Sequence, residues 1–273
     1  MGLILCSVPP SEEGFRIDDL GIRIYSLEEL CYCLRQYPIL FLEEFPDRAL
    51  LSFLSTGLGE TSLASQLLSL QENGSSPPSL ILKLMEGSGL CGTEELGAFR
   101  AELMALTGLP ELERLQKKSD LLFSLKRYGR VLSVCGRLRG VAREGLGNSG
   151  LLADILVREG CAAANLFRFE EARERFLEAW KRRPETDTLK KLYFLARLQG
   201  GEEPALEDLP DRERLEENRA AWDREFEEAQ RAAEKEPEYG EALEAFYGDP
   251  VQREKKAAAL VARMKRVYRE QLI

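Results

Sequence analysis

Residues 151–184 read LLADILVREGCAAANLFRFEEARERFLEAWKRRP, and this stretch decides the fold expected for the chain. It opens with an apolar segment of helical character and continues through a short polar break. From Phe169 to Trp180 apolar side chains recur at helical spacing between charged ones, which predicts a second, amphipathic helix. Pro184 then ends the segment. The stretch therefore predicts a helical hairpin.

The small and aromatic residues of this stretch resemble a tetratricopeptide repeat (TPR) that begins at Ala153. A unit of that family spans about 34 residues and favours, in order, glycine, alanine, an aromatic residue, alanine and proline at five fixed positions. Those positions are held here by Gly160, Ala172, Phe176, Ala179 and Pro184. The resemblance implies that Gly160 and Ala172 lie where the two helices cross closely, and that Phe176 fills the gap toward the next helix.

Partial copies of the unit flank this match, so the resemblance to TPR proteins is degenerate and is best over residues 112–200. Upstream, 117–125 and 128–138 have the character of a first and a second helix, and the glycine-rich segment 145–150 supplies an inserted turn. Downstream, 188–198 resembles the first helix of a third unit, but glycines and a proline interrupt its partner. About two and a half units are expected.

The chain is therefore expected to be all-α, a TPR-like solenoid of helical hairpins with a small N-terminal helical region and C-terminal capping helices. Three segments are expected: a mainly helical region over 1–108, the repeats over 109–202, and a helical extension or cap over 203–273. Gly21–Tyr25 alternates like a short strand, and Ser26-Leu27-Glu28-Glu29 is a capping box that starts a helix. Further helices are expected to start at Asp47, at Thr61 or Ser62, near Pro77, at Thr93 and at about Val251.

The composition favours a globular, cytoplasmic protein. The chain has 44% hydrophobic residues, a net charge of −9 and no histidine, which removes the commonest general base and the usual zinc ligand. Its six cysteines are scattered, as expected of free thiols in a reducing compartment. The N-terminus lacks a basic leader before Pro9-Pro10, and apolar runs such as 38–42 are too short to cross a bilayer. We therefore expect no secretion and no membrane partner.

Charge is unevenly distributed, with a basic middle between two acidic ends. Residues 1–100, 101–200 and 201–273 carry net charges of −8, +6 and −7. Attraction between the parts of one molecule explains this pattern most simply. The alternative is a nucleic-acid-binding regulator that uses the basic region 114–191.

Motifs for catalysis and cofactor binding are few. No Gly-Lys dipeptide and no Gly-x-Ser-x-Gly segment occurs, which excludes the usual P-loop and the hydrolase nucleophile elbow. Gly87–Gly92 and Gly145–Gly150 match the dinucleotide fingerprint, and the first would be preceded by a strand at Leu80–Met85. A nucleotide-dependent enzyme built on Gly87–Gly92 is therefore a third alternative. Cys31-Tyr32-Cys33 is too short for a metal knuckle, so no catalytic residue, metal or cofactor is expected.

The leading hypothesis is a non-enzymatic adaptor or scaffold that binds a protein or peptide in a TPR-like groove. The resemblance implies that the first helix of each unit lines this groove, which gives the candidate contacts Gln116, Asp120, Phe123, Ser124, Asp154, Arg158, Cys161, Asn165, Lys191 and Tyr193. Trp180, Tyr193 and Phe194 would supply apolar anchors. The carboxylate clamp of chaperone-binding TPR proteins is absent, because its positions hold Gln116, Asp120, Arg158, Thr188 and Leu192. The chain would be a monomer, or a dimer through its C-terminal helices.

Overall fold

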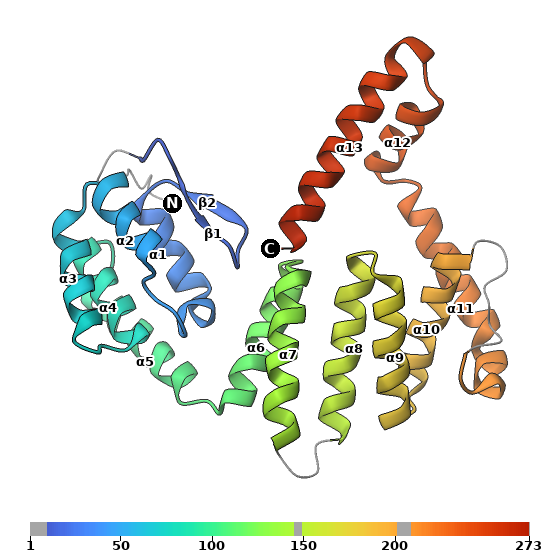
Figure 1. Ribbon diagram of the computed structural model, residues 1–273, viewed down its shortest axis with the longest axis horizontal. Coiled ribbons are helices and arrows are strands. Elements are labelled where there is room, and N and C mark those ends of the chain that lie inside the picture. Colours follow the sequence, from blue (N-terminus) through green and yellow to red (C-terminus); the bar gives the residue numbers. More distant parts are fainter. Residues whose placement is uncertain (1–9, 145–148, 201–208, 273) are drawn as a thin grey trace. The chain divides into compact units, whose positions relative to one another are not determined.

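The computed structural model describes residues 10–144, 149–200 and 209–272, and within them the chain is almost entirely helical (Figure 1). Thirteen α-helices and one two-stranded sheet provide nearly all the regular structure of these residues. The expected all-α fold class is therefore confirmed. Of the features expected from the sequence, the apolar N-terminus, the turn over 145–148 and the interruption over 201–208 lie outside the described residues.

The chain divides into two compact units, Met1–Leu125 and Lys126–Ile273, and each is described by itself. The sequence predicted breaks after residues 108 and 202, and those boundaries remain a prediction. Helix α6 (Glu111–Ser124), which the sequence expects to open the repeats, contacts the short 3₁₀-helix η1 (Pro38–Phe41) of the first unit. Lys118 of α6 forms ion pairs there with Glu43 at 3.2 Å and with Asp19 at 3.7 Å. The helices over 117–125 and 128–138 thus fall into different units.

The first unit begins with a small β-hairpin and a capped helix. Strand β1 (Phe15–Ile17) pairs antiparallel with β2 (Ile22–Ile24). Strand β2 lies within the segment Gly21–Tyr25, where the sequence predicted a short strand. At the start of α1 (Leu27–Gln36), the Glu29 N–H donates to Ser26 Oγ at 3.2 Å, as the predicted capping box requires. The Glu29 carboxylate accepts from the Tyr25 N–H at 2.5 Å, one residue before the cap.

Short helices complete the first unit close to the positions expected from the sequence. They are α2 (Arg48–Ser52), the π-helix η2 (Phe53–Gly57), α3 (Thr61–Glu72), α4 (Pro77–Ser88) and α5 (Thr93–Thr107). Asp47 caps α2 by accepting from the Leu50 N–H at 2.7 Å. The core of the unit is built mainly from leucines that are almost completely buried, including Leu30, Leu34, Leu54, Leu67, Leu84 and Leu103.

The segment Leu80–Met85 is helical, which corrects the strand interpretation on which the dinucleotide-binding alternative depended. It lies inside α4, whose first residue is Pro77, a favourable helix-starting position. The glycines that follow serve helix packing and helix ends. A Cβ on Gly87 would be 2.6 Å from Leu63 Cδ1, Gly89 ends α4 with a φ of +66°, and Gly92 precedes α5. A phosphate loop between a strand and a helix is therefore not formed here.

The second unit is a row of helices, each packed on the next (Figure 1). In order these are α7 (Tyr128–Glu144), α8 (Ser149–Asn165), α9 (Phe169–Arg182), α10 (Thr186–Gly200) and α11 (Arg212–Ala233). The turn between α8 and α9 places Phe167 at a φ of +58°. The two helices predicted from residues 151–184 therefore form, and they pack against each other as a hairpin.

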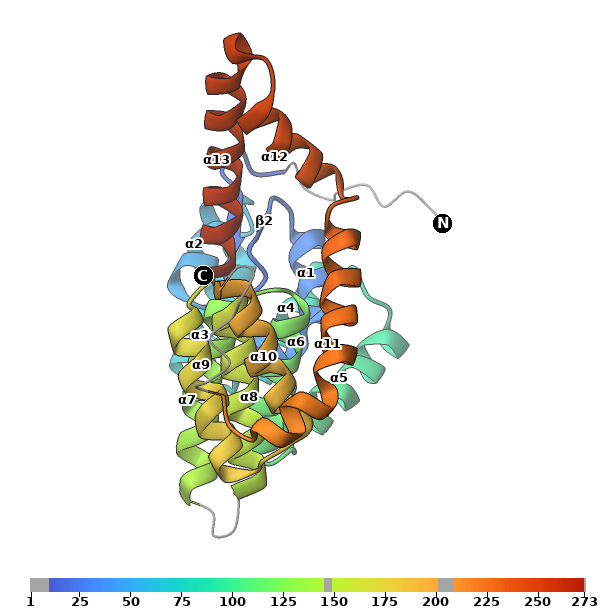
Figure 2. The same ribbon diagram turned by 90° about the vertical axis from the view of Figure 1, so that its right-hand side faces the viewer.

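Two further helices, α12 (Pro237–Tyr247) and α13 (Pro250–Leu272), pack against each other as a helical hairpin (Figures 1 and 2). The last turn of α13 lies against the first turn of α7, where Arg127 Nη1 donates to the Glu270 carbonyl at 2.7 Å. Gly129 of α7 permits this contact, because a Cβ there would overlap the Leu272 carbonyl. The row of helices is thus joined to α13 at its α7 end.

Candidate functional site

The α8–α9 hairpin is held together by small residues where the two helices cross. The ring of Phe176 on α9 lies against Gly160 on α8, so closely that a Cβ on residue 160 would be 2.5 Å from Phe176 Cε1. Ala172 and Ala179 on α9 are fully buried. The close crossing that the sequence predicted for Gly160 and Ala172 is therefore present in the hairpin.

Helices α10 and α11 extend this core. Phe176 belongs to a cluster of buried side chains that includes Leu189, Leu192 and Tyr193 on α10 and Trp222 on α11. The rings of Tyr193 and Trp222 have centroids 5.6 Å apart, and the Tyr193 hydroxyl donates to Asp223 Oδ1 at 2.5 Å. Burial, reinforced by this hydrogen bond to Asp223, raises the pKa of Tyr193 to about 12. Tyr193 thus fastens α11 to α10.

A buried carboxylate joins the three helices α7, α8 and α9. Glu159 on α8 is 2% exposed and lies between two guanidinium groups. Arg139 Nε of α7 is 2.9 Å from Glu159 Oε1, and Arg175 Nε of α9 is 3.3 Å from Glu159 Oε2. Burial raises the pKa of Glu159 above its ordinary value, although Arg139 and Arg175 act to lower it. This side chain therefore has a structural task between helices.

The candidate contacts on α6 are separated by the division of the chain from those on α8 and α10. Asp120 and Ser124 are exposed, while Gln116 and Phe123 are half-buried, and all four belong to the first unit. The remaining candidates belong to the second unit. The part that the α6 residues were expected to play in the groove therefore stays a prediction, and the second unit is described by itself.

On the second unit, polar residues of α8 and α10 share one surface. Asp154, Arg158, Cys161 and Asn165 follow each other along α8 at helical spacing, and none of them is fully buried. Burial raises the pKa of Cys161, and the nearby charges of Lys191, Asp187 and Arg158 also act on this thiol. We call the set Asp154, Arg158, Cys161, Asn165, Asp187 and Lys191 the α8–α10 surface.

Ion pairs order the edges of this surface. Lys191 pairs with Asp187 one turn earlier on α10. Arg183, from the connection between α9 and α10, donates to Asp154 on α8, with Nη1 3.4 Å from Oδ2. Asp187 and Arg183 were not among the contact residues expected from the sequence. The spacing of four residues between Asp187 and Lys191 was the signal that could have found the first of them.

Several expected contact residues are used inside the unit instead. Tyr193 is only 1% exposed, so its side chain faces Trp222 rather than a partner. Trp180 was expected as an apolar anchor. The Arg214 guanidinium lies over its ring, with Arg214 Cζ 5.4 Å from the ring centroid. Phe194 packs against Phe226, with ring centroids 5.8 Å apart. Of the three, only Tyr193 is buried, and all three of these contacts are made with residues of α11.

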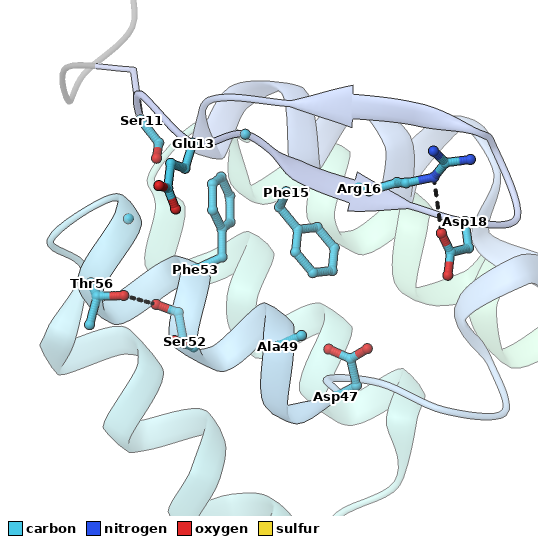
Figure 3. Close-up of a pocket in the computed structure, with 12 residues that line it drawn as sticks. Ser11, Glu13, Phe15, Arg16, Asp18, Asp47, Ala49, Ser52, Phe53 and Thr56 are labelled. Atoms are coloured by element: carbon cyan, nitrogen blue, oxygen red, sulfur yellow. Dashed lines mark hydrogen bonds and ion pairs between the residues drawn. The ribbon is translucent and has the colours of Figure 1, made fainter. Parts of the chain in front are cut away.

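A cavity of about 440 Å³ lies in the first unit between β1 and the α2–η2 segment (Figure 3). Its walls carry Phe15 and Phe53, whose rings have centroids 5.5 Å apart. The polar groups around it serve local structure: Arg16 Nε is 3.2 Å from Asp18 Oδ1, and Thr56 Oγ1 donates to the Ser52 carbonyl at 2.7 Å. Asp47, also on the wall, caps α2. This arrangement does not build a nucleophile with an adjacent base.

Three further observations bear on the site. Within the described part of the chain, no group of three or more acidic or cysteine side chains is placed to hold a metal ion. No helix among the described residues combines the length and apolar character needed to span a membrane. Comparison with protein-family models, with curated proteins and with solved structures finds no match.

Proposed function

We propose that the second unit is the binding part of a non-enzymatic adaptor, and that it holds an extended or helical segment of a partner protein on the α8–α10 surface. In this proposal α8 and α9 form one TPR-like hairpin, and α10 is the first helix of the next one. The support is local: the sequence motif falls on two packed helices, and the ring of its aromatic residue lies against its glycine.

A single observation carries the proposal. Helices α8 and α10 are not consecutive, yet Cys161 of α8 packs against the buried cluster that contains Leu189 and Leu192 of α10, near the charges of Asp187 and Lys191. In stacked helical hairpins the first helices of neighbouring units line one face, which other proteins use for peptides. The α8–α10 surface combines both charge signs with a neutral thiol and an amide, which suits the mixed side chains of a peptide.

Four arginines of the basic middle segment are committed to ion pairs, which weighs against the nucleic-acid alternative. Arg139 and Arg175 face Glu159, Arg182 faces Glu178 at 2.9 Å, and Arg183 faces Asp154. A phosphate backbone requires cationic groups that can exchange their counterions for phosphates. Part of the positive charge of the 101–200 segment is thus neutralised by ion pairs within the fold.

A peptide selection tests the proposal. A phage-displayed peptide library would be selected on the immobilised protein, and the affinity of a recovered peptide would be measured by fluorescence polarisation. The double substitution Arg158→Glu, Asn165→Ala should weaken binding about tenfold or more. The matched control is Lys181→Glu on the exposed side of α9, which makes the same charge change as Arg158→Glu and should leave affinity unchanged.

Two outcomes would count against the proposal that the chain is an adaptor. One is a selected peptide that binds the Arg158 variant and wild type equally well, while both melt at the same temperature. The other is a failure to select any peptide, combined with salt-sensitive binding of generic RNA to the wild-type protein, which would favour the nucleic-acid alternative. A large loss of thermal stability in the variant would assign Arg158 and Asn165 a structural role.

A further inference from the structure

The α12–α13 hairpin has one charged edge. Ala245 of α12 and Leu260 of α13 are buried in the seam between the helices. Along one side of this seam, Lys256 Nζ is 3.0 Å from Glu244 Oε2, and Arg263 pairs with Glu241 one turn further away from the connection. These two cross-helix pairs fix which edge of the hairpin is polar.

The opposite side of the seam is apolar and uncovered. Tyr239, Leu243 and Phe246 follow one stripe of α12, roughly 100° or more around the helix from Glu241 and Glu244. Val261 and Met264 continue this stripe on α13. All five side chains are exposed, with Phe246 at 54% and Met264 at 59%. Clustered apolar side chains of this kind mark an interaction surface. We call these five residues the hairpin face.

The two helices that share the hairpin face carry opposite charges. Helix α12 contains three glutamates and no basic residue, a net charge of −3. Helix α13 contains seven basic and two acidic residues, a net charge of +5. A partner of one charge sign would be attracted by one helix and repelled by the other. A surface that carries the two signs side by side is matched by a copy of itself turned through a two-fold axis.

We propose that the hairpin face binds the hairpin face of a second copy of this chain. The two-fold axis places α12 of each copy against α13 of the other, and the four helices then form a bundle with the apolar side chains inside. Acidic α12 lies next to basic α13 at both rims. This contact is separate from the α8–α10 surface, so a dimer would present two peptide-binding surfaces.

The size of the face sets the strength of the contact. At 1.5 Å per residue, the 23 residues of α13 extend about 35 Å and the 11 residues of α12 about 16 Å. With helices about 10 Å across and a face confined to the length of α12, the face projects roughly 300 Å² in each copy, below the ~800 Å² of a standard stable interface. The association is therefore reversible and depends on concentration.

Sedimentation velocity of the whole chain over a range from low to high micromolar concentration tests the proposal. Wild type should shift from monomer to dimer, and Phe246→Glu, Met264→Glu should remain monomeric with an unchanged helical circular-dichroism spectrum. The matched control is Met104→Glu in the first unit, which alters a side chain that is 68% exposed, more than Phe246 or Met264, and should leave the dimer intact.

A second measurement on wild type guards against a variant that fails to fold. Hydrogen exchange of 239–247 and 257–264 should slow as protein concentration rises, with no change in 93–107. A wild type that stays monomeric at every concentration, or a dimer that survives both glutamate substitutions, would overturn the proposal. Binding of monomeric wild type to phosphatidylserine vesicles, lost in the double variant, would assign the face to a lipid surface instead.

Discussion

The ring of Phe176 lies directly against the backbone of Gly160, and this contact sets the distance between α8 and α9. Gly160→Ala adds a methyl group where no space exists, so α8 and α9 must separate or the ring must shift. We expect a loss of about 1–3 kcal/mol in the free energy of unfolding, measured by urea denaturation. The second substitution Phe176→Leu should recover part of this loss, because it removes the opposing ring.

The control for this prediction is the same substitution at a glycine with free space. Gly136 lies within α7, is exposed, and a Cβ there would have no heavy atom within 4 Å. Gly136→Ala should therefore stabilise the chain by about 0.5–1 kcal/mol, because alanine favours the helix. Equal effects at residues 136 and 160 would contradict the packing argument.

Glu159 predicts a pH dependence whose sign follows from its raised pKa. A carboxyl with a higher pKa in the folded state binds its proton more tightly when folded, so folding is favoured at low pH. As pH rises from about 4.5 through the raised pKa, wild type should lose stability relative to Glu159→Gln, which carries no charge at any pH. Urea midpoints of both proteins between pH 4.5 and 7.5 measure this difference. A difference that grows in favour of wild type over that interval would contradict it.

The buried thiols predict an order of alkylation. Burial raises the pKa of Cys31 to about 12 and that of Cys33 to about 11, so neither forms an appreciable thiolate near pH 8. Cys91 is partly exposed between α4 and α5. Iodoacetamide should therefore modify Cys91 well before Cys31 and Cys33, and denaturant should abolish the order. Peptide mass spectrometry identifies the sites, and early labelling of Cys31 in the folded protein would refute the predicted burial.

Tyr193 is expected to contribute stability rather than partner affinity. Tyr193→Phe keeps the ring against Trp222 but removes the hydroxyl that donates to Asp223. The loss should be about 1 kcal/mol in the free energy of unfolding, the usual net value of one hydrogen bond. The affinity for a peptide selected on the α8–α10 surface should remain unchanged. A weakened peptide affinity without a change in stability would return Tyr193 to the binding site.

Local signals in the sequence located most of the helices. The Ser26 cap, the Asp47 cap and the start at Thr61 all depend on a few neighbouring residues, and the structure has helices at each of these places. Leu80–Met85 was misread as a strand because a short, continuous apolar run has the same appearance in a buried strand and a buried helix. The run is part of a longer helix, α4, whose full extent from Pro77 to Ser88 is evident only in the structure.

The candidate site was less accessible to sequence reasoning, since it depends on contacts between distant segments. Tyr193 has the character of a groove residue within its own helix, and only α11, some thirty residues later, buries it. The ion pairs of Lys118 with Asp19 and Glu43 likewise join α6 to segments some 75 to 100 residues earlier in the chain. Spacing within one helix cannot reveal either effect.

The contact between α7 and α13 has a consequence for the order of folding. Its hydrogen bond joins residues 143 positions apart, whereas each step from α7 to α11 joins neighbours in the sequence. Contacts between neighbours close small loops and form early, but a contact of this span requires almost all of the second unit to be synthesised first. During translation, α7 through α10 would therefore assemble while the first turn of α7 is still bare.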